Sequence, residues 1–211
     1  MTAKLPREPD AKRLAALTPA LRTLAAGTLL WRVYFRAGPH PMRWHDFRHY
    51  GPADARFDHH QSPKPGLQEQ AVMYLAESPA TCLAEVFQQT RVIHRENRQP
   101  WLLGLRLAQA AQVLDLTGVF ATRAGASMAL MSGPRSVGRA WARGFHGAYA
   151  QIQGLYYPSS MHANRPALVL NERAENAGVL PNKPHFHRAL ADPVLLTVLK
   201  NAALDIGFEL G

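Results

Sequence analysis

The sequence predicts a single α+β domain with a mixed β-sheet core and flanking helices. The chain has 211 residues, of which 47% are hydrophobic, so it can bury one sizeable core. Strand-like and helix-like segments follow one another without the regular alternation of a doubly wound sheet. We find no internal repeat, and we divide the chain into a helical lead-in over residues 1–28 and a main domain over residues 29–211.

The first elements are a broken helix and a strand. Residues 10–26 are rich in Ala and Leu and predict a helix with Asp10 as its N-cap, divided at Pro19. The run LLWRVYF, residues 29–35, has the aromatic and β-branched content of a strand.

A long loop separates this strand from the next. Residues 37–67 contain many Gly and Pro residues but also several aromatic ones, which indicates an ordered loop folded over the domain. The run AVMYLA, residues 71–76, predicts a second strand. Ser78 followed by Pro79 is a typical helix start, and we expect a helix over residues 79–90.

The second half continues the mixture of elements. The helix near residue 136 is expected to open at Ser136, and the last helix to begin at Asp192 and end at Gly207. The predicted strands are 101–107, 112–116, 154–160 and 167–172, and the predicted helices are 121–131, 136–151 and 192–207.

The charge of the chain favours an anionic partner. Lys and Arg outnumber Asp and Glu by 24 to 15, which gives a formal net charge of +9. Such an excess attracts anions without specifying which, so nucleic acid, a phosphorylated small molecule and an acidic protein are all compatible.

We expect neither a membrane-spanning segment nor a secretion signal. No apolar run approaches the roughly 20 residues of a membrane helix, and the first residues lack the apolar stretch of a signal peptide. We therefore expect a cytoplasmic protein without a membrane partner. The single cysteine, Cys82, has no disulfide partner within the chain and lies beside Leu83 and Ala84, as a buried small side chain does.

Glu85 is the carboxylate on which a catalytic interpretation depends. Its neighbours in the predicted helix are apolar, but a surface charge and a site acid both remain compatible with the pattern. Arg32 lies in an otherwise apolar strand, where pairing with Glu85 or another acid would explain its charge. Tyr74 is by default a core aromatic residue.

The histidines form no metal motif. His45 and His49 are four residues apart and His185 and His187 two apart, but no carboxylate or cysteine completes either set. We interpret these four as loop histidines and predict no metal site, while His59–His60 either contact a ligand or decorate the loop. Nucleotide-binding glycine fingerprints, G-x-S-x-G and H-E-x-x-H are absent, which disfavours Rossmann and P-loop enzymes, elbow-type serine hydrolases and zincins.

Several segments together resemble the RES domain, the toxin of RES and Xre toxin–antitoxin pairs. They are LWRVYF, YGPADARFDHH, VMYLAESPATCLAEVF, and IQGLYYPSS followed by ALVLNE, in this order along the chain. The family is named after an Arg, a Glu and a Ser. The resemblance carries these onto Arg32 or Arg56, onto Glu85 and onto Ser159, with Ser160 as the competing serine.

The resemblance implies an ADP-ribosyltransferase-like fold that degrades NAD by hydrolysis or phosphorolysis. NAD is then a substrate, inorganic phosphate is a possible co-substrate, and no other cofactor is expected. It also implies silencing by an Xre-type helix-turn-helix antitoxin, so that DNA is contacted only indirectly through the antitoxin.

The candidate residues suit this chemistry. Cleavage of the nicotinamide–ribose bond leaves positive charge on the sugar, which one placed carboxylate, Glu85, stabilises. Arg32 and Arg56 offer forked donors to the pyrophosphate, Tyr74 offers a ring face to the nicotinamide, and Ser159 offers a hydroxyl to the carboxamide or ribose.

Two alternatives remain open. The enzyme could transfer ADP-ribose to a macromolecule, but transferases of arginine commonly carry Glu or Gln two residues before the catalytic Glu, where this chain has Leu83. A basic nucleic-acid-binding protein without catalysis is supported only by the net charge. Salt-dependent DNA binding that survives Glu85→Gln would favour it.

Overall fold

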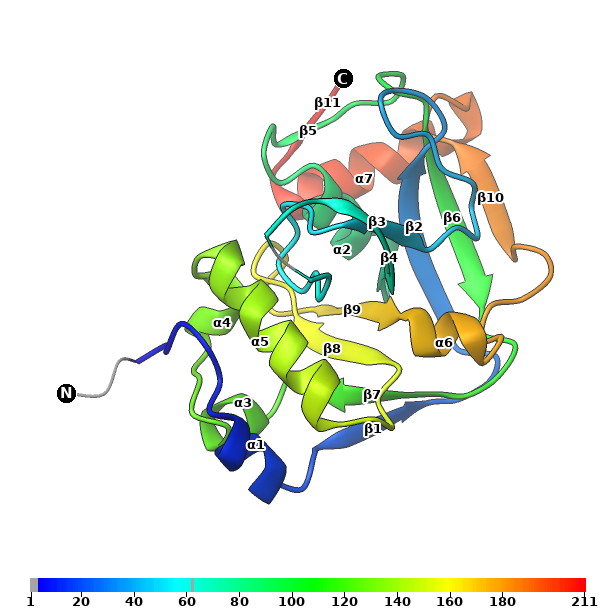
Figure 1. Ribbon diagram of the computed structural model, residues 1–211. Helices are drawn as coiled ribbons and strands as arrows, with labels where there is room; N and C mark the ends of the chain where they lie inside the picture. The colour runs from blue at the N-terminus through cyan, green and yellow to red at the C-terminus, as the bar shows by residue number, and fades with distance from the viewer. Residues whose placement is uncertain (1–3, 62) are drawn as a thin grey trace.

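The computed structural model describes residues 4–61 and 63–211, and a mixed nine-stranded sheet runs through the described part (Figure 1). Eight of its strands follow one another in the order β1–β7–β8–β9–β4–β2–β6–β10. The ninth strand, β3, pairs with β4. Neighbours are antiparallel except for the parallel pair β7–β8. The strands are β1 (Leu21–Leu24), β2 (Leu29–Phe35), β3 (Arg48–Gly51), β4 (Gly66–Ala76), β6 (Pro100–Arg106), β7 (Ala111–Asp115), β8 (Gly154–Pro158), β9 (Pro166–Asn171) and β10 (Phe186–Ala189), while β5 (Val92–Ile93) and β11 (Glu209–Leu210) form a separate parallel pair.

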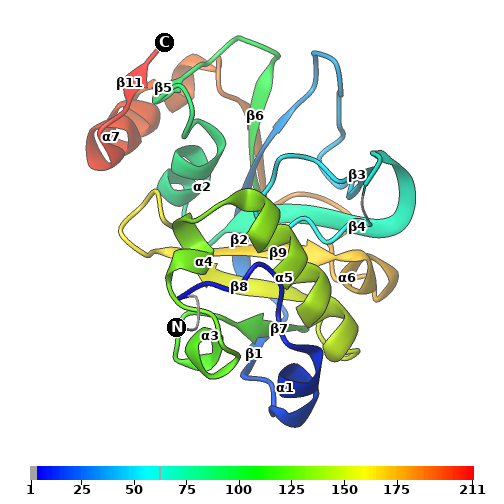
Figure 2. The ribbon, with the colours of Figure 1, turned by 60° about the vertical axis from the view of Figure 1, so that its left-hand side comes forward.

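Helices cover the sheet in two groups, as the two views of the ribbon show (Figures 1 and 2). One group packs over β7, β8 and β9, and the other, α2 with α7, packs beside β2 and β6. This arrangement confirms the predicted α+β class. The helices are α1 (Ala11–Ala16), α2 (Pro79–Val86), α3 (Phe120–Arg123), α4 (Ala129–Ser132), α5 (Arg135–Ala148), α6 (Glu172–Asn176) and α7 (Leu196–Ile206), the last preceded by the 3-10 turn η1 (Pro193–Leu195).

The sheet divides at one point, between β2 and β4. These strands pair only at Trp31 and Ala76, whereas β2 pairs with β6 over its whole length and β4 pairs with β9 over five residues. Because β2 and β4 separate beyond this contact, side chains from both strands reach a common opening between the two halves of the sheet.

The core fixes helix α2 beside this opening. Leu83 of α2 is fully buried in a cluster with Val33 of β2 and Leu199 of α7. On the same face of the sheet, Trp141 and Phe145 of α5 are fully buried against β8 and β9. Burying one such side chain stabilises the fold by about 1.5–3 kcal/mol, so α2 and α5 are held firmly in place.

Most predicted elements are confirmed, with shifted ends. Ser78 caps α2 by accepting a hydrogen bond from the Thr81 amide at 3.1 Å. Asp192 accepts from the Val194 amide at 3.0 Å, and Gly207 ends α7 with φ of +69°. The confirmed predictions are the strands at 29–35, 71–76, 101–107, 112–116, 154–160 and 167–172 and the helices at 79–90 and 192–207.

The prediction of a helix over residues 10–26 is wrong in its second half. Asp10 caps a helix that ends at Ala16, before Pro19, but Leu21–Leu24 form β1 at the edge of the sheet. The exposed edge of β7 offers unpaired backbone groups, and pairing with them outweighs the helix propensity of this short segment.

Other boundaries also differ. The loop over 37–67 contains β3, and β4 already begins at Gly66, because the two strands pair with each other. The helix over 121–131 is two short helices, α3 and α4. Helix α5 begins at Arg135 after Pro134, so Ser136 is not its cap. Elements α6 and β10 and the short strands β5 and β11 have no counterpart among the sequence predictions.

Two of the four predicted loop histidines lie in strands. His49 belongs to β3, and His187 belongs to β10, where its Nε2 lies 2.6 Å from the Tyr34 hydroxyl. Cys82 is buried as expected, and burial raises the pKa of its thiol to about 12. Within residues 4–61 and 63–211, no helix combines the length and the apolar character needed to cross a membrane.

Candidate active site

A cavity of about 290 Å³ occupies the opening between β2 and β4. Its walls come from β2, β4, helix α2, the segment 52–57, the start of α5 and the end of β8. The charged groups that line it are four arginines and two carboxylates, namely Arg32, Arg48, Arg56, Arg135, Asp54 and Glu85. A concave site with convergent cations suits an anionic ligand with apolar parts.

Glu85 enters the cavity from α2. Its Oε1 accepts a hydrogen bond from the Ser159 hydroxyl at 2.5 Å. Burial raises the pKa of Glu85, and the Ser159 hydrogen bond and the charges of Arg56 and Arg135 oppose that rise. The carboxylate is therefore partly desolvated and oriented, which a residue serving only as a surface charge would not be.

Ser159 lies behind Glu85 and has no exposed surface. Its Oγ accepts hydrogen bonds from the amides of Met161 and His162 at 3.1 and 3.2 Å and donates to Glu85. A hydroxyl has one proton and two acceptor positions, so these three contacts use all of them. In this arrangement Ser159 orients Glu85, and the serine that lines the cavity is Ser160.

His162 connects the Ser159 turn to α2. One ring nitrogen, Nδ1, lies 2.9 Å from Thr81 Oγ1, and Nε2 lies 3.2 Å from Asp205 of α7. Thr81 precedes Glu85 by four residues, so both lie on one face of the helix. His162 therefore holds the Ser159 turn in register with the helix that carries Glu85.

Arg32 is buried and lines the cavity. Its Nη1 donates to the backbone oxygens of Trp44 and Asp46, both at 3.0 Å. Burial lowers the pKa of Arg32 to about 10, which leaves it charged at neutral pH. Arg32 thus both places a charge at the cavity and fixes the loop that covers it.

Arg56 reaches the cavity from the segment 52–57. Its Nη1 donates to the Gly133 carbonyl at 2.5 Å, at the end of α4. Burial lowers its pKa, with a further contribution from the charge of Arg135. A Cβ on Gly138 of α5 would lie 2.6 Å from the Arg56 carbonyl, so glycine permits this close approach of segment and helix.

Two tyrosines line the cavity. Burial raises the pKa of Tyr74, and its buried hydroxyl makes no hydrogen bond within the described residues. Tyr157 comes from the end of β8, and its ring packs on Phe57 with 4.7 Å between the ring centroids. Both side chains offer ring surface to a planar ligand.

The structure brings most of the predicted residues together and adds others. Arg32, Arg56, Tyr74 and Glu85 line one cavity, and Ser159 contacts the last of these. Sequence reasoning missed Tyr157, Gln88 and Arg135, which also line it. Because side chains alternate between the two faces of a strand, the two tyrosines in GLYYPSS must point to opposite faces, which is a signal for Tyr157. No local pattern marks Gln88 or Arg135.

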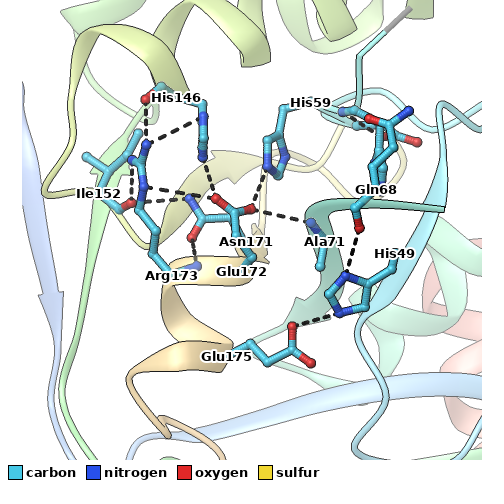
Figure 3. Close-up of polar contacts among 12 residues, drawn as sticks. His49, His59, Gln68, Ala71, His146, Ile152, Asn171, Glu172, Arg173 and Glu175 are labelled. Atoms are coloured by element: carbon cyan, nitrogen blue, oxygen red, sulfur yellow. Dashed lines mark hydrogen bonds and ion pairs between the residues drawn. The ribbon is translucent and has the colours of Figure 1, made fainter.

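A second polar cluster lies away from the cavity, around Glu172 at the start of α6 (Figure 3). His59 and His146 lie side by side, with their ring centroids 4.4 Å apart, and both reach it: their Nε2 atoms lie 2.8 Å from Oε2 and 2.6 Å from Oε1 respectively. Burial opposes ionisation of Glu172, but the two histidine hydrogen bonds outweigh it and hold its pKa below the ordinary value. His59 thus ties the loop after β3 to α5 and α6.

These three side chains also have the composition of a metal site. Their ligand atoms lie within 4.8 Å of one another. The nitrogen–oxygen distances are those of hydrogen bonds, and Arg173 places its Nη2 3.5 Å from His146 Nδ1. An adjacent guanidinium disfavours a cation here, so the absence of a metal site stays our prediction.

Comparison with known proteins places the chain in a family. The family model described as "RES domain" matches residues 29–191. Among solved structures, a chain in the crystal structure of the M. tuberculosis MbcT–MbcA toxin–antitoxin complex is similar, with a TM-score of 0.57 and 20% identity over 90% of this chain and 96% of that one. At this identity the likeness concerns the fold. No curated protein matches the chain.

Proposed function

The chain belongs to the RES domain family, and on this premise we propose that it degrades NAD by cleaving the bond between nicotinamide and ribose. The observation that carries the proposal is the position of Glu85, a partly desolvated carboxylate held by Ser159 in a cavity lined with arginines. A glycosidic bond to a good leaving group requires one such carboxylate and a place for the charged remainder of the substrate.

The reaction follows from these groups. The bond between the nicotinamide nitrogen and C1′ of the ribose breaks, and its electron pair leaves with neutral nicotinamide. Glu85 stabilises the cationic sugar: Ser159 fixes Oε1, and we assign Oε2 to the ribose. An oxygen of water or of inorganic phosphate then attacks C1′ and releases its proton to solvent, giving ADP-ribose or its 1-phosphate.

The other residues bind the substrate. We assign Arg32 and Arg56 to the pyrophosphate and the rings of Tyr74 and Tyr157 to the nicotinamide. NAD is the substrate, and no further cofactor is part of the proposal. Leu83 is fully buried, so the position two residues before Glu85 offers no polar group to a protein acceptor, which disfavours transfer to arginine.

We also propose that the protein acts in the cytoplasm as the toxin of a toxin–antitoxin pair. Family membership supports this, and the similar solved structure is itself a toxin–antitoxin complex. The partner would be an Xre-type helix-turn-helix antitoxin, through which any contact with DNA would be indirect. Expression of the chain alone should arrest a bacterial host, and Glu85→Gln should relieve the arrest.

The direct test is incubation of the purified protein with NAD, with and without inorganic phosphate, followed by chromatography of the products. We expect free nicotinamide together with ADP-ribose or ADP-ribose 1-phosphate, and the second product names the acceptor. Intact NAD under both conditions, from a protein that melts cooperatively, would contradict the proposal.

A further inference from the structure

Arg135 is a cavity-lining arginine to which the family pattern gives no role. It is the first residue of α5, and its guanidinium lies between two rims of the cavity. Its Nη1 donates to Asp54 Oδ2 at 2.6 Å, and its Nη2 donates to Gln88 Oε1 at 3.1 Å. The Arg135 side chain is 24% exposed and that of Asp54 is 74% exposed, so the carboxylate partner lies on the solvent side.

The partners of the arginines differ in how easily a ligand can replace them. Arg32 and Arg56 donate to backbone carbonyls, which cannot leave without moving the chain. Arg135 also donates to one backbone carbonyl, that of Asp54 at 3.2 Å, but its carboxylate partner belongs to an exposed side chain that can rotate into water. The charge of Arg135 also reaches Glu85 and Arg56. It opposes the rise that burial causes in the pKa of Glu85, and it adds to the fall that burial causes in the pKa of Arg56.

A carboxylate and a phosphate present similar oxygen acceptors to a guanidinium. An exposed ion pair of this kind contributes little to stability. When a doubly charged pyrophosphate replaces Asp54, Arg135 therefore faces more negative charge and more acceptor oxygens. Loss of the Asp54 ion pair costs little stability.

We propose that Arg135 binds the pyrophosphate of the dinucleotide, and that Asp54 occupies this position in the free protein and is displaced by the substrate. This inference rests on the proposed function. It makes Asp54 a built-in competitor that lowers the affinity of the site for NAD.

Arg139 provides a matched control. It lies one helical turn after Arg135, and its Nη1 donates to Asp54 Oδ1 at 3.2 Å. Unlike Arg135, it is not among the residues that line the cavity. Loss of Arg139 removes a similar charge and a contact with the same carboxylate without removing a group from the cavity.

The experiment is calorimetric binding to the full chain carrying Glu85→Gln, which prevents turnover. The probes are NAD, ADP-ribose and nicotinamide riboside, of which the last lacks a pyrophosphate. Arg135→Gln should weaken NAD and ADP-ribose by about tenfold or more and leave nicotinamide riboside unchanged. Asp54→Asn should tighten NAD by roughly threefold, because it removes a competing charge, and Arg139→Gln should change it by less than about twofold.

The inference would be overturned if Arg135→Gln left the affinity for NAD unchanged, or if it weakened the binding of all three probes equally. It would also be overturned if Asp54→Asn weakened the binding of NAD, because Asp54 would then support Arg135. Should Arg135→Gln fail to fold, Arg135→Lys replaces it and should show a smaller, pyrophosphate-dependent loss. A parent chain that neither binds nor cleaves NAD overturns the proposed function as well. If the parent cleaves NAD but the Arg135 and Asp54 variants bind NAD as tightly as the parent does, the inference alone is overturned.

Discussion

The two walls of the cavity are built by different means. On the wall formed by α2 and the turn 159–165, Glu85 is held by a fully buried serine, and the helix packs into the core through Leu83. On the wall formed by segment 52–57 and the start of α5, charged side chains meet at the surface, where Asp54 is largely exposed. The first wall preorganises one reactive group, whereas the second supplies adjustable, salt-sensitive attraction.

The largest effect should come from the rigid wall. Glu85→Gln keeps the shape of the side chain but removes its charge, so NAD turnover should fall by at least about a hundredfold. Binding of NAD should change far less, because the arginines remain. Steady-state rates and calorimetric affinities separate the two effects.

Glu96→Gln, at an exposed position outside the cavity, is the matched control and should behave like the parent. Comparable turnover in folded Glu85→Gln would remove Glu85 from the chemistry.

His162→Ala should have the next largest effect. The side chain links the Ser159 turn to Thr81, and its loss should misplace Glu85 and lower kcat by about tenfold to a hundredfold with little change in KM. Substitution of its exposed partner by Asp205→Asn should have a small effect. A rise in KM as large as the fall in kcat would instead indicate general damage to the site.

Ser159→Ala should shift the pH dependence of the reaction. The Ser159 hydrogen bond lowers the pKa of Glu85 against the effect of burial, so its removal should raise that pKa. Because the carboxylate must be ionised, the acidic limb of kcat should move to higher pH. A pH–rate profile that coincides with that of the parent would exclude Ser159 as the group that tunes Glu85.

The smallest effect concerns stability away from both walls. Burial lowers the pKa of His59 below its ordinary value of 6.5, with a further contribution from His146, although Glu172 opposes the shift. The unfolded chain then binds the proton more tightly, so stability should fall as pH drops below about 6.5. Melting temperatures between pH 7.5 and 5.5 should decrease, and less steeply in His59→Asn. An equal slope in the two proteins would exclude His59 as the source.

The sequence predicts the rigid wall better than the charged one. The Ser78–Pro79 start and the apolar neighbours of Glu85 are local patterns, and they locate α2 and its carboxylate directly. The strand patterns likewise place Arg32 and Tyr74 in β2 and β4, whereas the roles predicted for them come from the resemblance to RES domains. Their meeting in one cavity depends on the single contact between β2 and β4, which no local pattern specifies.

The remaining differences arise from tertiary contacts. Arg135 reaches the cavity because α5 packs against segment 52–57, about 80 residues earlier in the chain. Leu21–Leu24 become a strand because β7 offers an edge, and His59 meets Glu172 only once α5 and α6 are in place. Composition and periodicity do not carry this information.

The central claim is that Glu85 cleaves the nicotinamide–ribose bond of NAD. The measurement that tests it most directly is the release of nicotinamide from NAD by the purified parent chain, followed over time beside Glu85→Gln at equal protein concentration. The account predicts release by the parent in excess of the protein present and almost none by the variant. Release at equal rates, or none from a folded parent freed of any bound partner, would contradict it.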